Sequence, residues 1–402
     1  MRRLNRAWAA AMLLVGTLTM ADAAAAQCGD SIGWERWLDG VRQEAAAAGI
    51  SRATIGALDG VTYDQSVVDA DRRQRVFAQS FLEFSDRMVA QYRLTQGAKL
   101  LNQYASIFSQ IEQRYGVPGP VIASFWGLET DFGANIGDRS TLRSLASLAY
   151  DCRRPDVFRP QLISALRIID RGDLRPHEMI GPWAGELGQT QFLPSHYVEY
   201  GVDFDGDGRR DLLRSAPDAL ASAANLLAHH GWRRGEPWLE EVRVPAQLPW
   251  DQADLSIMHP RANWAAWGVR RADGGALSAD NMPASLLLPM GRNGPAFLAY
   301  PNFAVYLEWN SSLVYATTAA YFATRLAGAP RVSRGNGQVD TLSFAETREL
   351  QQLLQRQGLS VGKVDGIIGE QTRAAVKAMQ IRLGLPADSY PTHELLQRLR
   401  RL

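Results

Sequence analysis

The segment that most constrains the fold is residues 121–126, an apolar run that is followed closely by a single acidic residue, Glu129. The run comes after a Gly-Val-Pro sequence where a helix can begin, and it predicts a buried helix. A carboxyl group at the end of such a helix loses its hydration, which raises its pKa and favours the protonated form that a general acid needs. Most glutamates at helix ends are instead solvated, capping or ion-paired, so the rest of the chain has to decide.

The composition is that of a folded and nearly neutral protein. The chain has 402 residues, 46% of them hydrophobic, and a formal net charge of +1. It is long enough for two or more domains. The charge balance gives no sign of nucleic-acid binding. The six histidines include no helical pair at metal-ligand spacing, so catalytic zinc is not expected.

The N-terminus has the layout of a secretory signal peptide. Basic residues come first, then an apolar stretch from Ala7 to about Met20, then four alanines that end at Ala26. The apolar stretch is too short for a good membrane span, and no other segment comes close. We therefore expect residues 1–26 to be cleaved on export, and the mature protein to be a periplasmic monomer without a transmembrane segment.

The chain has two cysteines, Cys28 and Cys152, and both lie in the exported part. In an oxidising compartment a disulfide between them is favoured over two unpaired thiols. Cys28 follows the signal sequence closely, which raises the alternative of a lipoprotein. The residues before Cys28, Ala-Ala-Gln, lack the usual lipobox pattern, so the soluble form is favoured.

Helical periodicity covers most of the chain and predicts a mainly α fold. It runs through residues 34–110, 155–171 and 217–230, and a last helix is expected over 311–326. Short β-prone runs, among them 242–244, 285–288 and 303–307, predict a small strand-containing insertion. Residues 327–341 contain Gly, Pro, Ser and Asn and are expected to form a linker.

Residues 342–402 form a separate unit with three expected helices. Its loop Asp365-Gly366-Ile367-Ile368-Gly369, the following residues 372–376 and Gln380 resemble the three-helix peptidoglycan-binding domain of cell-wall hydrolases. The resemblance implies that peptidoglycan glycan strands are the partner of this chain. Such a domain raises the local concentration of substrate at its enzyme.

Seven segments between residues 127 and 310 occur in the order of a second known family. They are residues 127–133, Arg153-Arg154, 183–194, 202–208, 230–232, Asn302-Phe303 and Trp309-Asn310. Together they resemble the lytic murein transglycosylases of the membrane-bound type B class, a lysozyme-like family. The resemblance implies that residues 27–326 form an α-rich lysozyme-like catalytic domain with a small β insertion, with Glu129 as its single catalytic carboxylate.

The resemblance also implies the chemistry. Glycosidases normally use two carboxylates, whereas this family uses one, first as acid and then as base. The 6-hydroxyl of the MurNAc unit attacks after the MurNAc–GlcNAc β-1,4 bond breaks, which leaves a 1,6-anhydro end and needs no cofactor. Two alternatives stay open: a hydrolytic muramidase that uses a second carboxylate such as Glu186, and a murein-binding scaffold without activity.

Several residues are expected to bind the glycan because they match family positions or suit sugars. They are Gln191, Asn310, Gly185, Gly188, Trp309, Tyr315, Arg153 and Arg154. Gln191 can both donate and accept hydrogen bonds, and the two glycines would let the backbone approach the glycan. The aromatic residues offer flat faces to sugar rings, with core packing as the alternative. Pro182 replaces a small polar Ser of the family, and an ion pair with Arg is favoured for Glu186.

An acidic loop has carboxylates at the spacing of a calcium loop. Its candidate ligands are Asp203, Asp205, Asp207, Asp211 and the backbone carbonyl of Arg209. The twelfth position is Arg214 instead of Glu, and the resemblance implies that Asp218 closes the loop. A structural calcium ion is predicted, and the alternative is a turn whose Asp residues cap neighbouring helices.

Overall fold

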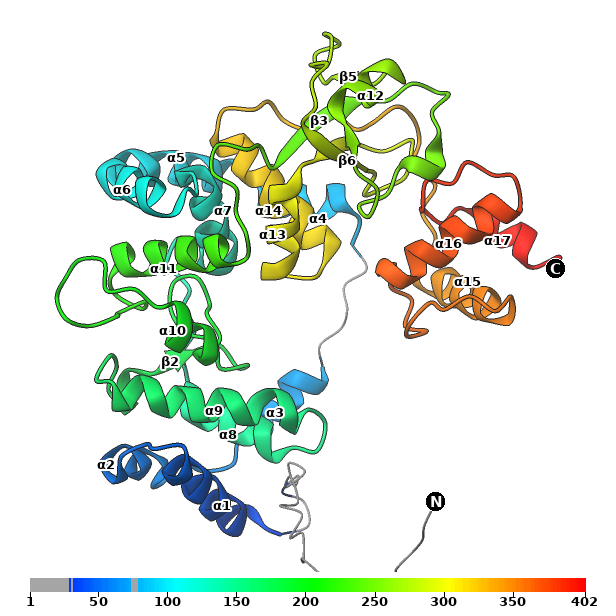
Figure 1. Ribbon diagram of the computed structural model, residues 1–402. Helices are drawn as coiled ribbons and strands as arrows, with labels where there is room; N and C mark the ends of the chain where they lie inside the picture. Colours follow the sequence, from blue (N-terminus) through cyan, green and yellow to red (C-terminus); the bar gives the residue numbers. More distant parts are fainter. Residues whose placement is uncertain (1–28, 30–31, 74–78) are drawn as a thin grey trace, which may run out of the picture.

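The computed structural model describes residue 29, residues 32–73 and residues 79–402 (Figure 1). The predicted signal peptide, residues 1–26, and Cys28 lie outside these residues, so cleavage and the disulfide with Cys152 stay predictions. Helices dominate, as the periodicity predicted. None of the helices in the described ranges is long and apolar enough to cross a membrane.

The larger part of the molecule contains two hydrophobic cores. One core lies among α1 (Trp34–Ala47), α2 (Arg52–Ile55), α3 (Gln65–Arg72), α8 (Thr141–Tyr150), α9 (Pro155–Asp170) and α10 (Pro194–Tyr200). The other lies among α4 (Phe81–Met88), α5 (Gln91–Gln103), α6 (Ala105–Tyr115), α7 (Gly119–Thr130), α11 (Ala216–His229), α13 (Pro301–Trp309) and α14 (Leu313–Leu326). Short 3-10 turns occur at Gly56–Leu58, Pro176–Glu178 and Trp250–Gln252. In Figure 1 the first core lies below the second.

Helix α7 is the buried helix that the apolar run predicted. Pro118 precedes its first turn, and almost every side chain up to Leu128 is buried. It packs against α5, α6, α11 and α14, which together surround it. The helix ends because Asp131 takes a left-handed conformation with φ of 51°. Glu129 therefore lies in the last turn of the central helix.

A small antiparallel sheet forms the predicted insertion. Its strands are β3 (Leu239–Arg243), β4 (His259–Pro260), β5 (Arg270–Arg271), β6 (Pro283–Leu287) and β7 (Ala296–Ala299), in the order β4-β6-β7-β3-β5. Helix α12 (Arg261–Ala266) follows β4, and the sheet has a core of its own. Elsewhere, β1 (Arg139–Ser140) pairs with β2 (Ile180–Gly181).

One predicted strand, residues 303–307, is wrong, because this segment lies in helix α13. Pro301 stands in the first turn, where proline favours a helix start. Phe303 and Tyr306, three residues apart, are buried, while Ala304 and Glu308, four apart, are exposed. The burial has a helical period, although the residue types favour a strand. Strand β7 went unpredicted.

The C-terminal unit has the three predicted helices, α15 (Phe344–Arg356), α16 (Glu370–Arg382) and α17 (His393–Leu399), around a separate core. Gln351 of α15 holds the Asp-Gly-x-x-Gly loop in place. Its side-chain oxygen accepts a hydrogen bond from the backbone N–H of Gly366 at 2.8 Å, and its Nε2 donates to the carbonyl of Ile367 at 2.9 Å. The buried side-chain amide of Gln351 thus supplies the hydrogen bonds that the backbone of an irregular loop cannot obtain from a helix or a sheet.

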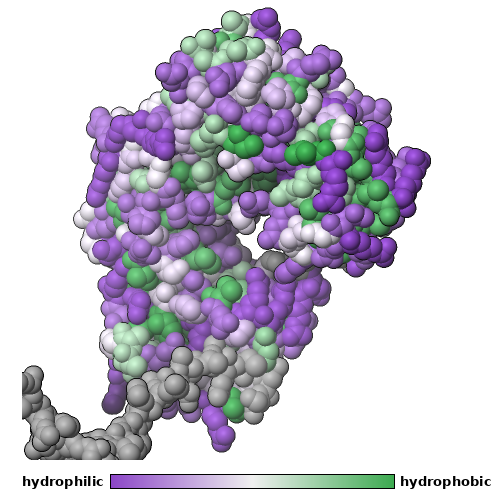
Figure 2. Space-filling model, turned by 45° about the vertical axis from the view of Figure 1, so that its right-hand side comes forward, coloured by the Kyte–Doolittle hydropathy of each residue, from purple (hydrophilic) through white to green (hydrophobic). Residues whose placement is uncertain are grey.

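The C-terminal unit is bound to the sheet insertion by polar contacts. Lys377 Nζ of α16 lies 2.8 Å from Asp254 Oδ2, and Arg373 Nη2 donates to the carbonyl of Leu288 at 2.8 Å. The segment 327–341 also packs on the insertion, because the N–H groups of Asn336 and Gly337 donate to the carbonyl of Asn293. Figure 2 shows a hollowed surface between this unit and the larger body.

We expect the double variant Arg373→Ala and Lys377→Ala to uncouple the two parts of the molecule. The substitutions remove two interdomain contacts and leave the carboxylate of Asp254 without its ammonium partner. In differential scanning calorimetry, the C-terminal unit of the double variant should then unfold in a separate transition. Its unfolding temperature should be lower than that of the same unit in the wild type. Arg398→Ala, which removes an exposed ion pair within α17, is the control. An unchanged trace would show that these contacts do not couple the domains.

Candidate active site

Glu129 lies where the two large cores meet. Trp309, at the end of α13, packs against both cores and contacts Glu129. Tyr315, in the first turn of α14, also contacts Glu129. The side chain of Glu129 is partly buried. The carboxyl group thus lies at the boundary of the two halves of the molecule.

One oxygen of Glu129 receives both neighbouring donors. Trp309 Nε1 donates to Oε1 at 3.0 Å, and the hydroxyl of Tyr315 donates to the same atom. Among the described residues, none makes a hydrogen bond with Oε2. Donors stabilise negative charge on the oxygen that accepts them. When the group is protonated, the proton therefore belongs on Oε2.

The pKa of Glu129 is raised above its ordinary value. Burial is the largest cause, because it penalises the charged form, and the charge of Glu186 adds to it. The hydrogen bonds from Tyr315 and Trp309 act in the opposite direction and stabilise the carboxylate. Burial therefore favours the acid form of Glu129, while the two hydrogen bonds favour the carboxylate. This agrees with the prediction from the apolar run.

Trp309 and Tyr315 act on the carboxyl group directly. The indole ring of Trp309 stacks on Phe125 with centroids 4.2 Å apart and meets Phe192 edge to face at 5.8 Å. Burial and the adjacent Glu129 hold the pKa of Tyr315 well above its usual value, so its hydroxyl remains a donor. The sequence singled out both residues as sugar-stacking faces; that contact stays a prediction, and the bonds to Glu129 were not foreseen.

Gln189 fastens the segment 181–192 to α7, and the sequence did not identify it. Its Oε1 accepts from Trp126 Nε1 at 2.9 Å, and its backbone carbonyl accepts from the hydroxyl of Thr130 at 2.6 Å. Its Nε2 donates to the carbonyl of Leu213 at 3.1 Å. The side chain is buried, so its role is to position the segment beside Glu129. Gln189 lies only two residues before Gln191, and the sequence gave no sign of which of the two side chains is buried.

Gln191 has a left-handed backbone with φ of 53°, which is uncommon for a residue other than glycine. Its Nε2 donates to the carbonyl of Gly188 at 2.9 Å. No hydrogen bond to its Oε1 comes from the described residues. Strained backbone of this kind is often found at functional sites. Gln191 thus presents an acceptor that is available to a ligand.

The structure explains why glycine is needed at Gly185 and Gly188, and the explanation differs from the predicted one. Both have positive φ, of 87° and 82°. A Cβ on Gly185 would lie 2.4 Å from Leu145 Cδ2, and one on Gly188 would lie 2.6 Å from the carbonyl oxygen of Leu212. These glycines are required by packing within the protein. A close approach of the glycan is not needed to explain them.

Asn310 and Asp131 end their helices in different ways. Asn310 Oδ1 accepts from the N–H of Ser312 at 2.9 Å, which turns the chain into α14. Its side-chain amide has no acceptor among the described residues. Asp131 Oδ1 accepts from Arg93 Nε at 2.6 Å, and this hydrogen bond lowers the pKa of Asp131. Asp131 therefore ties α7 to α5, in line with the structural role favoured from the sequence.

Arg153 and Arg154 are occupied within the protein. Both guanidinium groups pair with the buried carboxylate of Asp71 in α3, and Arg153 Nη1 also donates to the carbonyl of Asp71 at 2.7 Å. A buried carboxylate needs such partners. Their side chains are still 42% and 36% exposed. Contact of either arginine with the substrate stays a prediction, while their role in holding α3 is shown.

Glu186 does not form the favoured ion pair with any described arginine. Its Oε2 is buried and has no hydrogen-bond partner in the described part of the chain. Burial raises its pKa, while the charge of Arg154 lowers it. Pro182, in the same segment, has no side-chain donor. One oxygen of Glu186 therefore has no partner among the described residues, while its carboxylate accepts a hydrogen bond from its own backbone N–H.

The acidic loop brings three of the predicted metal ligands together. Oxygen atoms of Asp203, Asp205 and Asp218 lie within 4.8 Å of one another. Hard cations such as Ca²⁺ prefer oxygen ligands of this kind, so the three residues fit such an ion. The predicted carboxylate ligands Asp207 and Asp211 are not in this group, and the backbone carbonyl of Arg209 stays a prediction. Asp207 accepts from the N–H of Arg209 instead, at 2.8 Å.

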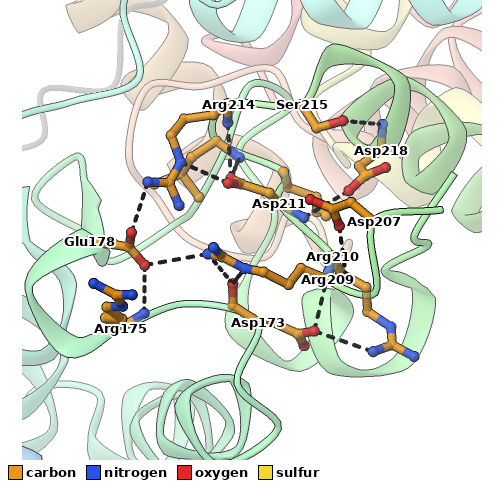
Figure 3. A network of polar contacts seen from close by, with 12 residues as sticks. Asp173, Arg175, Glu178, Asp207, Arg209, Arg210, Asp211, Arg214, Ser215 and Asp218 are labelled. Carbon is orange, nitrogen blue, oxygen red and sulfur yellow. Dashed lines mark hydrogen bonds and ion pairs between the residues drawn. The ribbon is translucent and has the colours of Figure 1, made fainter. Parts of the chain in front are cut away.

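Asp211 and its neighbours form a separate ionic network (Figure 3). Arg214 Nε lies 2.7 Å from Asp211 Oδ2, and its Nη1 lies 2.8 Å from Glu178 Oε1. The side chain of Arg209 donates to the carbonyl of Asp173 at 2.9 Å. Asp211 thus pairs with Arg214, three residues away. This pairing explains why Asp211 is not in the group formed by Asp203, Asp205 and Asp218. Asp173 and Glu178 were not foreseen as partners of the loop.

The network predicts a loss of stability in acid. The hydrogen bond from Arg214 is the main cause that lowers the pKa of Glu178 from 4.5 to about 2. A lowered folded-state pKa adds stability above the unfolded value, and that stability is lost as the pH falls from about 4.5 to about 2. Glu178→Gln should therefore flatten the acid dependence of the unfolding free energy in this window. Glu112→Gln, at an exposed glutamate, is the control, and equal slopes for both variants would contradict the assignment.

Comparison with known proteins identifies relatives of this chain. The model of the Transglycosylase SLT domain matches residues 33–324, and that of a peptidoglycan binding domain matches residues 345–399. Membrane-bound lytic murein transglycosylase B of Escherichia coli (strain K12) is 30% identical over 238 residues. These are 59% of this chain and 64% of that relative, so the chain matches just under two thirds of its length.

Solved structures resemble the chain over most of its length. The crystal structure of SltB3 from Pseudomonas aeruginosa in complex with NAG-anhNAM-pentapeptide has a TM-score of 0.85 at 42% identity, covering 92% of this chain and 100% of that one. The Escherichia coli lytic transglycosylase Slt35 in complex with calcium has a TM-score of 0.61 at 27% identity, covering 72% and 92%.

Proposed function

The chain belongs to the family of the Transglycosylase SLT domain, with a lysozyme-like α-rich fold and a C-terminal peptidoglycan-binding domain, and on this premise we propose that it is a lytic transglycosylase of peptidoglycan. The bond cleaved is the MurNAc–GlcNAc β-1,4 linkage. The observation that carries the proposal is Glu129, whose Oε1 accepts two donors while Oε2 is left to carry the proton.

The reaction begins with Glu129 as a general acid. Its Oε2–H gives the proton to the glycosidic oxygen, and the bond between this oxygen and C1 of MurNAc breaks. The developing negative charge on Glu129 is stabilised by Trp309 and Tyr315, which already donate to Oε1. The acetamido oxygen of MurNAc stabilises the positive charge at C1.

Glu129 then acts as a base. Its carboxylate takes the proton from the 6-hydroxyl of the same MurNAc unit, and the oxygen of that hydroxyl forms a bond to C1. The product has a 1,6-anhydro ring, and Glu129 regains its proton. No water is consumed and no cofactor takes part. One carboxylate therefore suffices for both steps.

Gln191 and Asn310 are proposed to hold the acetamido groups. Gln191 offers Oε1 as an acceptor, and Asn310 offers its amide as a donor, since neither group is used by a described residue. These opposite functions match the N–H and the carbonyl of an acetamido group. Gly185 and Gly188 are proposed to act only by shaping the segment that carries Gln191, because their missing side chains face Leu145 and Leu212.

Digestion of purified sacculi followed by mass spectrometry tests the proposed reaction. We expect muropeptides that are one water lighter than hydrolysis products, because the MurNAc end is closed by its own hydroxyl. The SltB3 structure holds a ligand with an anhydro sugar, which supports this expectation. Reducing ends as the main product would show that the enzyme is a hydrolytic muramidase instead.

The place of action follows from the substrate. Peptidoglycan lies outside the cytoplasmic membrane, and the N-terminal sequence is typical of export, so we propose a periplasmic enzyme. The C-terminal unit would keep it on the glycan, and its contacts with the insertion give it a defined orientation to the catalytic domain.

A calcium ion is proposed at Asp203, Asp205 and Asp218. Three carboxylates whose oxygen atoms lie this close repel one another, and a divalent cation relieves the repulsion. The Slt35 structure contains calcium, in agreement with this proposal. Removal of calcium by a chelator should lower the midpoint of thermal unfolding, and added calcium should restore it. Asp203→Asn should weaken the response, and a chelator without effect on the wild type would contradict the site.

A further inference from the structure

A cavity of about 130 Å³ lies between the sheet insertion and the C-terminal unit. Its walls come from the turn between β6 and β7, from the segment 327–341, and from the loop between α16 and α17 with the flanking turns of both helices. Figure 1 shows the C-terminal unit beside the insertion, to which its polar contacts bind it. The residues that contact Glu129 do not line this cavity, so the proposed reaction leaves it unused.

A buried carboxylate joins two walls of the cavity. Asp388, in the loop before α17, is 2% exposed, and it accepts from Gln380 Nε2 at 2.8 Å and from the backbone N–H of Arg292 at 3.0 Å. The next residue, Ser389, has a left-handed backbone with φ of 62°, which is uncommon for a residue other than glycine. Backbone strain of this kind is often found where proteins hold ligands. Because Asp388 connects the C-terminal unit to the insertion, the cavity keeps its shape without a ligand.

Three polar side chains that line the cavity have unused hydrogen-bonding groups. The guanidinium of Arg292 lies 3.5 Å from Asp388 Oδ2, and none of its N–H groups makes a hydrogen bond with a described residue. No donor within the described ranges reaches Asn293 Oδ1 or Glu394 Oε2 either. The side chain of Arg292 is 33% exposed. The cavity thus offers a fork of cationic donors and two acceptor oxygens.

These groups match the end of a peptide. A guanidinium binds a carboxylate through two parallel hydrogen bonds. The oxygen of an amide and an ionised carboxylate accept hydrogen bonds, so Asn293 Oδ1 and Glu394 suit N–H groups. The size agrees, because a cavity of about 150 Å³ holds a molecule as large as benzene, which is comparable to one small amino-acid residue. A disaccharide is several times larger.

In peptidoglycan, the peptide stems carry such groups. The glycan strand presents hydroxyl and acetamido groups, and the lactyl carboxyl group of MurNAc is consumed in the amide bond to the stem. We propose that the cavity is a binding site for the carboxylate-bearing end of a peptide stem, with Arg292 as the residue that holds the carboxylate. The inference rests on the proposed function, because it takes peptidoglycan as the substrate. Binding of a stem at this site leaves the glycan strand free to reach Glu129.

Isothermal titration calorimetry of the full-length protein with the stem tetrapeptide L-Ala-γ-D-Glu-meso-diaminopimelic acid-D-Ala tests the site. We expect saturable binding to the wild type. Arg292→Ala should weaken it about tenfold or more, because a hydrogen-bonded charge pair is lost. A peptide with all its carboxylates converted to carboxamides should bind the wild type more weakly by the same factor, and this change should matter much less in Arg292→Ala. Arg356→Ala, at an exposed arginine of α15, is the control.

The proposal would be overturned if the wild type showed no saturable binding, or if Arg292→Ala bound the tetrapeptide as tightly as the wild type. Equal effects of amidation on the two proteins would also refute a direct contact with Arg292. If calorimetry shows that Arg292→Ala lowers the unfolding temperature of the C-terminal unit, Arg292→Lys is measured in its place. Lysine keeps a positive charge beside Asp388 but lacks the fork, so binding should still weaken.

Catalysis takes no part in this measurement, so the two proposals can fail separately. A wild-type enzyme that releases anhydro ends and does not bind the tetrapeptide would refute this site alone. A wild-type enzyme that binds the tetrapeptide and releases no anhydro ends would refute the proposed reaction alone.

Discussion

A Glu129→Gln variant is expected to lose turnover of sacculi by about 10²-fold to 10⁴-fold, the usual contribution of a general acid and base. Glutamine fills nearly the same space and still accepts from Trp309 and Tyr315, so the fold should be preserved. It can neither give a proton to the leaving oxygen nor take one from the 6-hydroxyl. The measurement is the rate of soluble muropeptide release at saturating substrate.

Two controls separate chemistry from binding. Co-sedimentation with sacculi should be unchanged in Glu129→Gln, because the C-terminal unit is far from the substitution in sequence and has its own core. Glu112→Gln, at an exposed glutamate of α6, should keep the wild-type rate. Turnover of Glu129→Gln within a few-fold of wild type would remove Glu129 from the mechanism.

An Asp218→Ala variant is expected to lose about 3 kcal/mol or more of unfolding free energy. The side chain is fully buried and accepts from the backbone N–H groups of Phe204, Asp205 and Asp211 at 2.8, 3.3 and 2.8 Å. The N–H of Asp211 is buried and the other two are partly buried, and each donor left without an acceptor costs about 1 kcal/mol. Denaturant unfolding at neutral pH, with calcium removed, measures the loss without any contribution from a bound ion.

Asp207→Ala is the matched control for this variant. Asp207 lies in the same loop but is exposed, and it accepts from one backbone N–H, that of Arg209. Its loss should cost about 1 kcal/mol or less. Equal losses in the two variants would show that the loop is not organised around Asp218.

The sequence predicted a desolvated carboxyl group at Glu129 because the cause is local. Residues 121–128 are apolar without interruption apart from one serine, and such a helix must be buried, so a carboxyl group in its last turn is desolvated. The partners of Glu129 could not be predicted in the same way. Trp309 and Tyr315 are 180 and 186 residues away, and only the packing of α13 and α14 against α7 brings them there.

The one wrong strand has a similar origin. Residues 303–307 are β-prone by type, yet the burial of Phe303 and Tyr306 against the central helix makes them helical. A tertiary contact thus decided between local alternatives. The pairing of Arg153 and Arg154 with Asp71, more than eighty residues earlier, could not be predicted from the sequence either, for the same reason.

We propose that the 6-hydroxyl of MurNAc, and not water, attacks C1. Digestion of sacculi by the wild-type enzyme in oxygen-18 water, followed by mass spectrometry of the new MurNAc ends, tests it directly. We expect anhydro ends without oxygen-18, since solvent takes no part in either step. New reducing ends that carry one oxygen-18 atom would contradict it and would assign the enzyme to hydrolysis.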